Sequence, residues 1–219
     1  MFNRKNLLCL SSVATAVTLG LLATGAANAD TFVPLSGGEL VKTLSDGTVV
    51  TVHLTGESAT ISPSLGSTPV HRNAWVSGSA QVEVAGEGAD GGLITAGYVV
   101  GCQVDIAGGS VSGGVDGSVS SAGQGAAGAN TGGELSLGPG QATSFYILDR
   151  EKADDFGAES HKPYNVFAGA SGSVTWADQT IGLSGCGGYA QARAFVNVEV
   201  VTESVTSWVT LWGQPFSLG

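Results

Sequence analysis

The sequence predicts an all-β protein in which a β-sandwich carries one long amphipathic hairpin. Many stretches are rich in Val, Thr, Ile and aromatic residues, and they alternate between apolar and polar side chains, as strands with one buried face do. No long window repeats apolar residues at helical spacing. Between residues 101 and 140 the aromatic residues disappear, but the alternation continues among Gly, Ala and Ser. These three observations give the fold class and set the hairpin apart from the sandwich.

Residues 1–29 have the features of a secretory signal peptide. Arg4 and Lys5 precede a largely apolar run, and Ala27-Asn28-Ala29 has the small-x-small form of a signal peptidase site. We therefore expect export and a mature chain that begins at Asp30. A retained membrane anchor is the alternative, but the apolar run is short for a span and no charged stop follows it.

The composition of the mature chain limits its partners. Removal of the signal takes away two basic residues and no acidic ones, which leaves 6 basic and 18 acidic residues and a net charge of −12. Such a surface repels phosphate backbones, so no nucleic-acid partner is expected, whereas cations are attracted. The chain is 42% hydrophobic and only 12% charged. This combination fits either a glycine-rich sandwich or a membrane β-barrel, whose strands alternate in hydropathy.

The sandwich strands are expected in two blocks, 30–97 and 141–219, on either side of the hairpin. The stretches with the clearest alternation are 48–54, 74–86, 143–148, 172–185 and 189–213. The polar stretch 149–164 is expected to be a solvated loop with at most one helical turn.

Residues 98–140 are expected to form the hairpin, with its turn at 120–133. Apolar and polar residues alternate up to Ile106, and Gly108-Gly109 then shifts the parity as a bulge would. This alternation argues against a disordered Gly/Ser linker. About 20 residues per strand reach roughly 65 Å, which exceeds the core of a small domain and favours a barrel strand over a soluble hairpin.

Parity assigns the hairpin residues to two faces. The face expected to meet water in the pore holds Gln103, Asp105, Ser110, Ser112, Asp116, Ser118, Ser120, Glu134 and Ser136. The face expected to meet lipid holds Val111, Val115, Val119, Leu135 and Leu137.

No catalytic, cofactor or metal site is expected. Gly123, Gly125 and Gly128 match the spacing of a dinucleotide fingerprint, but residues 129–141 cannot form the helix that such a site needs. The three histidines, His53, His71 and His161, lack metal-ligand spacing. The pair Asp154-Asp155 is expected to be a solvated face. Four tryptophans in strand patterns are expected mainly in the core: Trp75, Trp176, Trp208 and Trp212.

Two cysteines remain once Cys9 leaves with the signal peptide. Cys102 and Cys186 form an even pair in an exported protein, which favours a disulfide. Two buried free thiols are the alternative.

Three stretches resemble the MspA family of octameric porins from mycolic-acid-bearing bacteria. VAGEGADGGLITAGYVVG (84–101) is similar to the family segment that leads into the pore stem. ADQTIGLSGCGGYAQARAF (177–195) is similar to its glycine-rich returning strands, and WGQPFSL (212–218) to its C-terminus. The similarity covers most of residues 72–219, whereas 30–71 and 149–164 match poorly.

The resemblance implies a goblet-shaped oligomer in the outer membrane. Each subunit would contribute a sandwich to the rim and one hairpin to a sixteen-stranded barrel, through which small hydrophilic solutes diffuse. A homo-octamer or a hetero-oligomer with a related subunit would fit. The family's best-known member has adjacent aspartates near the hairpin tip, and the corresponding stretch SSAGQGAAG has none. Asp105, Asp116 and Glu134 are therefore the candidates for a cation-preferring lumen. The alternative function is a secreted sandwich that acts as a binding or adhesion module.

Overall fold

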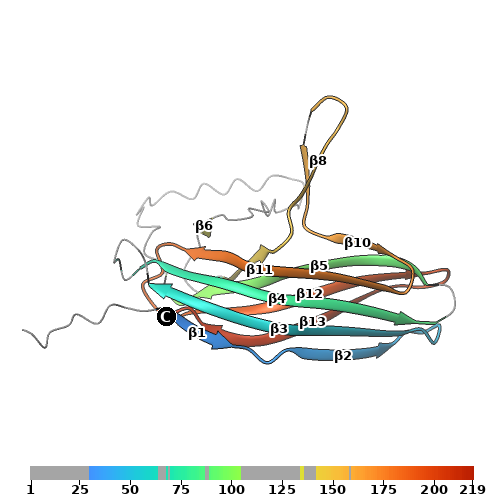
Figure 1. Ribbon diagram of the computed structural model, residues 1–219, viewed down its shortest axis with the longest axis horizontal. Helices are drawn as coiled ribbons and strands as arrows, with labels where there is room; N and C mark the ends of the chain where they lie inside the picture. The colour runs from blue at the N-terminus through green and yellow to red at the C-terminus, as the bar shows by residue number, and fades with distance from the viewer. Residues whose placement is uncertain are drawn as a thin grey trace, which may run out of the picture.

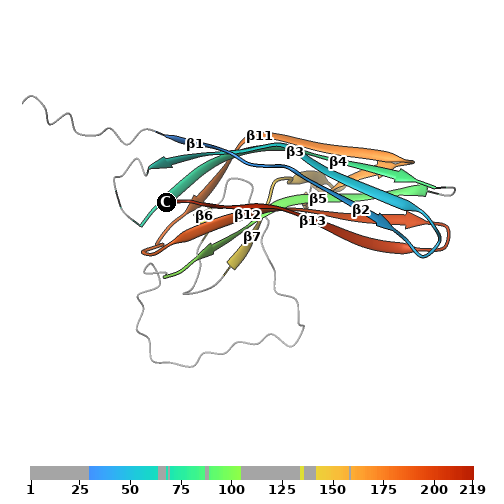
Figure 2. The ribbon, with the colours of Figure 1, turned by 90° about the horizontal axis from the view of Figure 1, so that it is seen from below.

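The computed structural model describes residues 30–63, 68, 70–86, 89–104, 134–135, 142–157 and 159–219. The body consists of two sheets packed face to face, which Figures 1 and 2 show from two sides. Sheet A has the order β1-β3-β4-β11-β6, with β2 beside β3, and sheet B has the order β10-β5-β12-β13, with β7 beside β5. All neighbours are antiparallel except β6 and β11. The described residues are all-β, as predicted.

The strands of sheet A are β1 (Thr31–Pro34), β2 (Gly38–Thr43), β3 (Val49–Pro63), β4 (Arg72–Ala85), β6 (Glu134–Leu135) and β11 (Ser171–Leu183). Those of sheet B are β5 (Ala89–Cys102), β7 (Ala142–Tyr146), β10 (Asn165–Ala168), β12 (Ala190–Thr202) and β13 (Thr206–Ser217). The alternating stretches of the sequence all lie in these strands, and 189–213 contains two of them, joined by the turn before Thr206.

The core lies between the sheets because one parity of each strand points inward. In β4, for example, Ala74, Val76, Ala80 and Val82 are at most 1% exposed. Gly78 is buried on the same face, while the residues of the other parity are partly or largely exposed. Burial of such apolar area is the main favourable term in folding.

Tyr98 is the largest fully buried side chain of this core. Its hydroxyl accepts a hydrogen bond from the Trp176 indole at 3.3 Å, and the two rings meet edge to face, 6.5 Å apart. Gly78 leaves room for this Trp176 ring, since a Cβ at that position would lie 2.7 Å from it. The core therefore depends on a small residue beside a large one.

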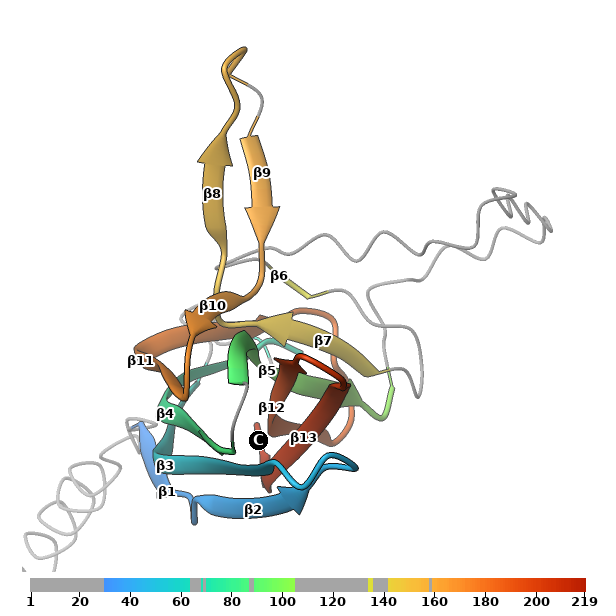
Figure 3. The same cartoon turned by 90° about the vertical axis from the view of Figure 1, so that its right-hand side faces the viewer.

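The stretch 149–164 is a β-hairpin, which corrects the expectation of a loop with one helical turn. Strands β8 (Arg150–Ala153) and β9 (Glu159–Lys162) pair with Arg150 opposite Lys162. The hairpin stands away from the sandwich (Figures 1 and 3). Since neither of its faces is buried, its strands show no alternation of apolar and polar residues in the sequence. The expectation of a solvated stretch was correct.

Strand β5 remains a sandwich strand to its end at Cys102, beyond the residue 98 at which the sequence placed the start of the hairpin. Residues 1–29, the expected signal peptide, lie outside the described residues, as does most of 98–140. The described part of the chain contains no helix that could span a membrane.

Candidate functional site

The predicted hairpin leaves and re-enters sheet B at one place. Strands β5 and β7 are antiparallel neighbours in sheet B, and Gly101 lies opposite Ala142. The chain thus departs after Cys102 and returns at Ala142, on the next strand. This is the geometry of a hairpin root, because the two arms of a hairpin are adjacent antiparallel strands.

The root is tied to the turn between β11 and β12. Cys102 and Cys186 form a disulfide with their Cα atoms 5.9 Å apart. Beside it, the Gln103 backbone N–H donates to the Tyr189 carbonyl at 2.9 Å, and the Gly187 N–H donates to the Val104 carbonyl at 2.9 Å. The two residues that follow Cys102 are therefore held to the turn that carries Cys186.

Few of the predicted pore residues lie in the described part of the chain. Gln103 is exposed at the root, and its Oε1 accepts from the Tyr189 N–H at 3.4 Å. Glu134 and Leu135 form β6, whose backbone pairs in parallel with Gly182 and Leu183 of β11. The other residues of the two predicted faces lie outside the described residues: Asp105, Ser110, Val111, Ser112, Val115, Asp116, Ser118, Val119, Ser120, Ser136 and Leu137.

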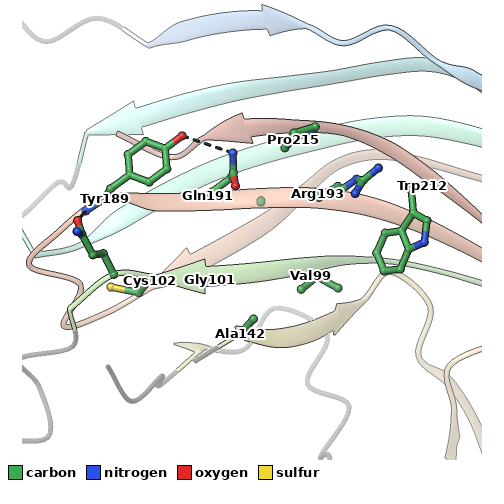
Figure 4. A pocket seen from close by; sticks show the side chains of 11 residues that line it. Val99, Gly101, Cys102, Ala142, Tyr189, Gln191, Arg193, Trp212 and Pro215 are labelled. Carbon is green, nitrogen blue, oxygen red and sulfur yellow. Dashed lines mark hydrogen bonds between the residues drawn. The ribbon is translucent and has the colours of Figure 1, made fainter. Parts of the chain in front are cut away.

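A groove of about 780 Å³ lies on the outer face of sheet B beside the root (Figure 4). Arg193 stacks over the Trp212 ring at 5.2 Å, and its Nε donates to the Gly213 carbonyl at 2.9 Å. At the other end, the Gln191 amide donates to the Tyr189 hydroxyl at 3.5 Å. The remaining lining residues are Val99, Gly101, Cys102, Gln103, Ala142, Ala192 and Pro215. The groove thus combines aromatic rings with one cation.

Two tryptophans expected in the core are exposed on this outer face. Trp208 is 62% and Trp212 45% exposed, whereas Trp176 is buried as expected. Trp212 continues a chain of ring contacts through Phe195 to Tyr146, each with centroids 6.0 Å apart. The sequence could not show which face of β13 is buried, because both faces carry large apolar residues. Val209 and Leu211 lie on the inner face, and the two tryptophans lie on the outer face.

Glu57 is a buried carboxyl group that the sequence did not reveal. It is 3% exposed, and neither of its oxygens has a hydrogen-bond partner among the described residues. Burial raises its pKa to about 7. A Cβ on Gly213 would lie 2.7 Å from Glu57 Oε2, so the Glu57 carboxyl group lies against the backbone of Gly213. The carbonyl of the same glycine accepts the hydrogen bond from Arg193 Nε on the outer side.

A register shift explains why Glu57 points inward. The pairing of β3 with β4 slips between Thr55 and Ser58, and Gly56 has a φ of 62°, which favours glycine. Simple alternation from the buried Leu54 would have placed Glu57 on the outer face. The Gly-Glu pair inside an otherwise regular strand was the only signal in the sequence.

Three side chains of metal-ligand type meet at the base of the β8–β9 hairpin. Single ligand atoms of Asp149, Glu151 and His161 all lie within 4.8 Å of one another, and His161 Nδ1 is 2.8 Å from Asp149 Oδ1. Linear spacing did not reveal this group because Glu151 and His161 meet across the hairpin. Exposed groups of this kind are also common on surfaces that hold no ion.

A comparison with protein-family models shows which family the chain is similar to. The family model described as MspA matches residues 46–217, which is most of the chain. This range includes all of β3 and the hairpin β8–β9, two regions in which the sequence motifs resembled the family poorly. No curated protein matches the chain.

Proposed function

The chain belongs to the MspA porin family, and on that premise we propose that it is the subunit of an oligomeric, water-filled channel for small hydrophilic solutes. The residues between Val104 and Ala142 would supply one hairpin per subunit to a transmembrane barrel. Closure of the barrel by several copies would pair the backbone N–H and C=O groups at the hairpin edges, to which lipid offers no hydrogen bonds. The sandwich would form the rim of the channel, in the outer membrane.

The observation that carries this proposal is the position of Gly101 opposite Ala142. A segment inserted between these two residues begins and ends on adjacent strands, so it can continue sheet B as a hairpin once Glu134–Leu135 leave their short pairing with β11 in sheet A. The disulfide and the backbone hydrogen bonds around Gln103 would fix the direction in which the hairpin leaves.

We further propose a preference for cations. From Asn73 through Asp149 the sequence contains no Lys or Arg, and the acidic residues include Asp105, Asp116 and Glu134. An oligomer would repeat each of these carboxylates as a ring, and such rings concentrate cations and repel anions.

The test is expression in a host with a mycolic-acid envelope, followed by detergent extraction and planar-bilayer recording. We expect a large oligomer in the detergent extract and stepwise conductance increases on its addition to the bilayer. As a matched control, the segment 105–141 is replaced by a short Gly/Ser turn, which should leave a folded, disulfide-linked sandwich without channel activity. A wild-type chain that is found as a monomer in the medium and gives no conductance would contradict the proposal and favour the secreted binding module.

A further inference from the structure

The outer faces of the two sheets differ in chemistry. Sheet A presents mainly Ser and Thr at its centre, such as Ser79 and Thr175, whose hydroxyl groups are 2.9 Å apart, and its exposed Phe32 and Val41 lie on the outlying strands β1 and β2. Sheet B presents the groove and its exposed rings, among them Tyr189 at 53% and Trp212 at 45% exposure. Exposed apolar surface with a polar rim marks an interaction site, so the outer face of sheet B is the one suited to a protein contact.

A second exposed apolar group lies on the β8–β9 hairpin. Phe156 is 96% exposed, more than any other large hydrophobic residue that the structure describes. The sequence around it is Asp154-Asp155-Phe156-Gly157, and the Phe156 N–H donates to Asp154 Oδ1 at 2.9 Å. The tip therefore presents an aromatic ring in a fixed turn beside two acidic residues.

We propose that the groove receives the β8–β9 tip of a second copy of the chain, with Phe156 as the anchor. The proposal rests on the proposed function, in which copies stand side by side in one barrel wall. The tip and the groove complement each other: the ring enters among Trp212, Tyr189 and Pro215, and the acidic residues approach Arg193.

Ring symmetry supports the pairing of two different surfaces. In a closed ring each copy contacts its neighbours through two distinct patches, one toward each side. The tip and the groove are such patches, and the hairpin extends roughly 15–20 Å from the sandwich at about 3.3 Å per residue (Figure 3). The groove also borders Gly101 and Ala142 at the root. A neighbour in the barrel wall would therefore lie beside it.

Cysteine cross-linking tests the contact directly. A chain with Asp155→Cys and Gln191→Cys carries one thiol at the tip and one in the groove. Oxidation of the detergent-extracted oligomer should give a ladder of covalently linked subunits on a non-reducing gel. The matched control pairs Asp155→Cys with Thr51→Cys on the outer face of sheet A and should give no ladder. Equal ladders from the two pairs, or none from the first, would overturn the contact.

Charge exchange gives a second, independent readout. Arg193→Glu should lower the recovered oligomer about tenfold, which corresponds to about 1.4 kcal/mol. Adding Asp155→Lys to the same chain, which keeps the Asp154 hydrogen bond of the turn, should restore part of it. Failure of that rescue in a chain whose sandwich melts like wild type would contradict the charge pairing.

Wild-type behaviour separates the two proposals. A wild-type chain that neither oligomerises nor conducts would overturn the proposed function, and the contact with it. A wild-type oligomer that conducts but does not cross-link through tip and groove would overturn the contact alone.

Discussion

Gly101 and Ala142 lie opposite each other on neighbouring strands, although the whole predicted pore segment separates them in sequence. The segment therefore has a root that is fixed in two ways, by strand pairing and by the disulfide a single residue away at Cys102. The sandwich and the predicted stem meet at this point.

Loss of the disulfide should loosen the root. The double variant Cys102→Ser and Cys186→Ser should lose about 2–4 kcal/mol of stability, because the bridge restricts the unfolded chain. Urea unfolding of the wild type with and without reductant should give the same difference. Alkylation of two thiols in the untreated native protein, detected by intact mass, would show that the bridge does not form.

Glu57 should make the rim less stable as the pH rises toward neutrality. The pKa of this carboxyl group is raised from 4.5 to about 7 in the folded state by burial. Between these values the folded chain keeps a proton that the unfolded chain has lost, so the stability is greatest below about pH 4.5 and falls until about pH 7. The loss is at most about 3 kcal/mol.

Thermal unfolding across this pH window measures the effect of Glu57. Glu57→Gln cannot titrate and should flatten the profile between pH 4.5 and 7. Glu83→Gln, at an exposed position on β4, serves as the control and should leave the slope unchanged. An identical slope in wild type and Glu57→Gln would assign the pH dependence to other groups.

Gly78 should resist even the smallest side chain. Gly78→Ala would place a Cβ 2.7 Å from the Trp176 ring and should cost about 1–3 kcal/mol through overpacking. The control is Gly182→Ala on β11 in the same sheet, where the nearest atom would be 3.5 Å away. Chemical denaturation followed by tryptophan fluorescence measures the stability of both variants. Equal stabilities of the two variants would show that the ring yields without cost.

The two faces of the predicted stem should respond differently to charge. Val115→Arg places a cation against lipid and should cost roughly 2–4 kcal/mol near mid-membrane. Ser112→Arg, on the face predicted to line the pore, should leave assembly nearly intact. Oligomer yield measures both. In a cysteine scan, equal labelling of Val115→Cys and Ser112→Cys by a membrane-impermeant reagent would contradict the barrel assignment.

Asp116 should contribute to ion selectivity. Reversal potentials in a salt gradient should show a cation preference that weakens in Asp116→Asn and weakens further in Asp116→Arg. The preference should also decline at high salt, since the Debye length falls to about 3 Å at 1 M. An anion-selective wild type would contradict the charge argument, and three equal reversal potentials would place Asp116 outside the lumen.

The sandwich strands could be predicted because each buries one face. In β4 the alternation from Ala74 to Val82 is visible in the sequence and in the burial alike. The charged hairpin β8–β9 has no buried face, so no pattern distinguished it from a loop. Glu57 was missed because one bulge reverses the parity of β3, and a bulge at a single glycine cannot be located without knowing the partner strand.

The groove could not be predicted because it joins distant parts of the chain. Val99 comes from β5, Trp212 from β13 and Tyr189 from the turn that precedes β12, and no one of these segments reveals in its sequence that β12 lies between β5 and β13. The family, in contrast, could be predicted from the resemblance of three short stretches. The family model matches residues 46–217 and confirms it.

The strand pairing of β5 sets an order of events during biogenesis. Strand β5 precedes the stem in the chain, but its central neighbour β12 and its cysteine partner Cys186 both follow it. Contacts between such distant segments form late, because a long loop must close first. The base from which the predicted stem would depart is therefore complete only after the C-terminal strands have been made, and insertion of the stem would wait for the sandwich to fold.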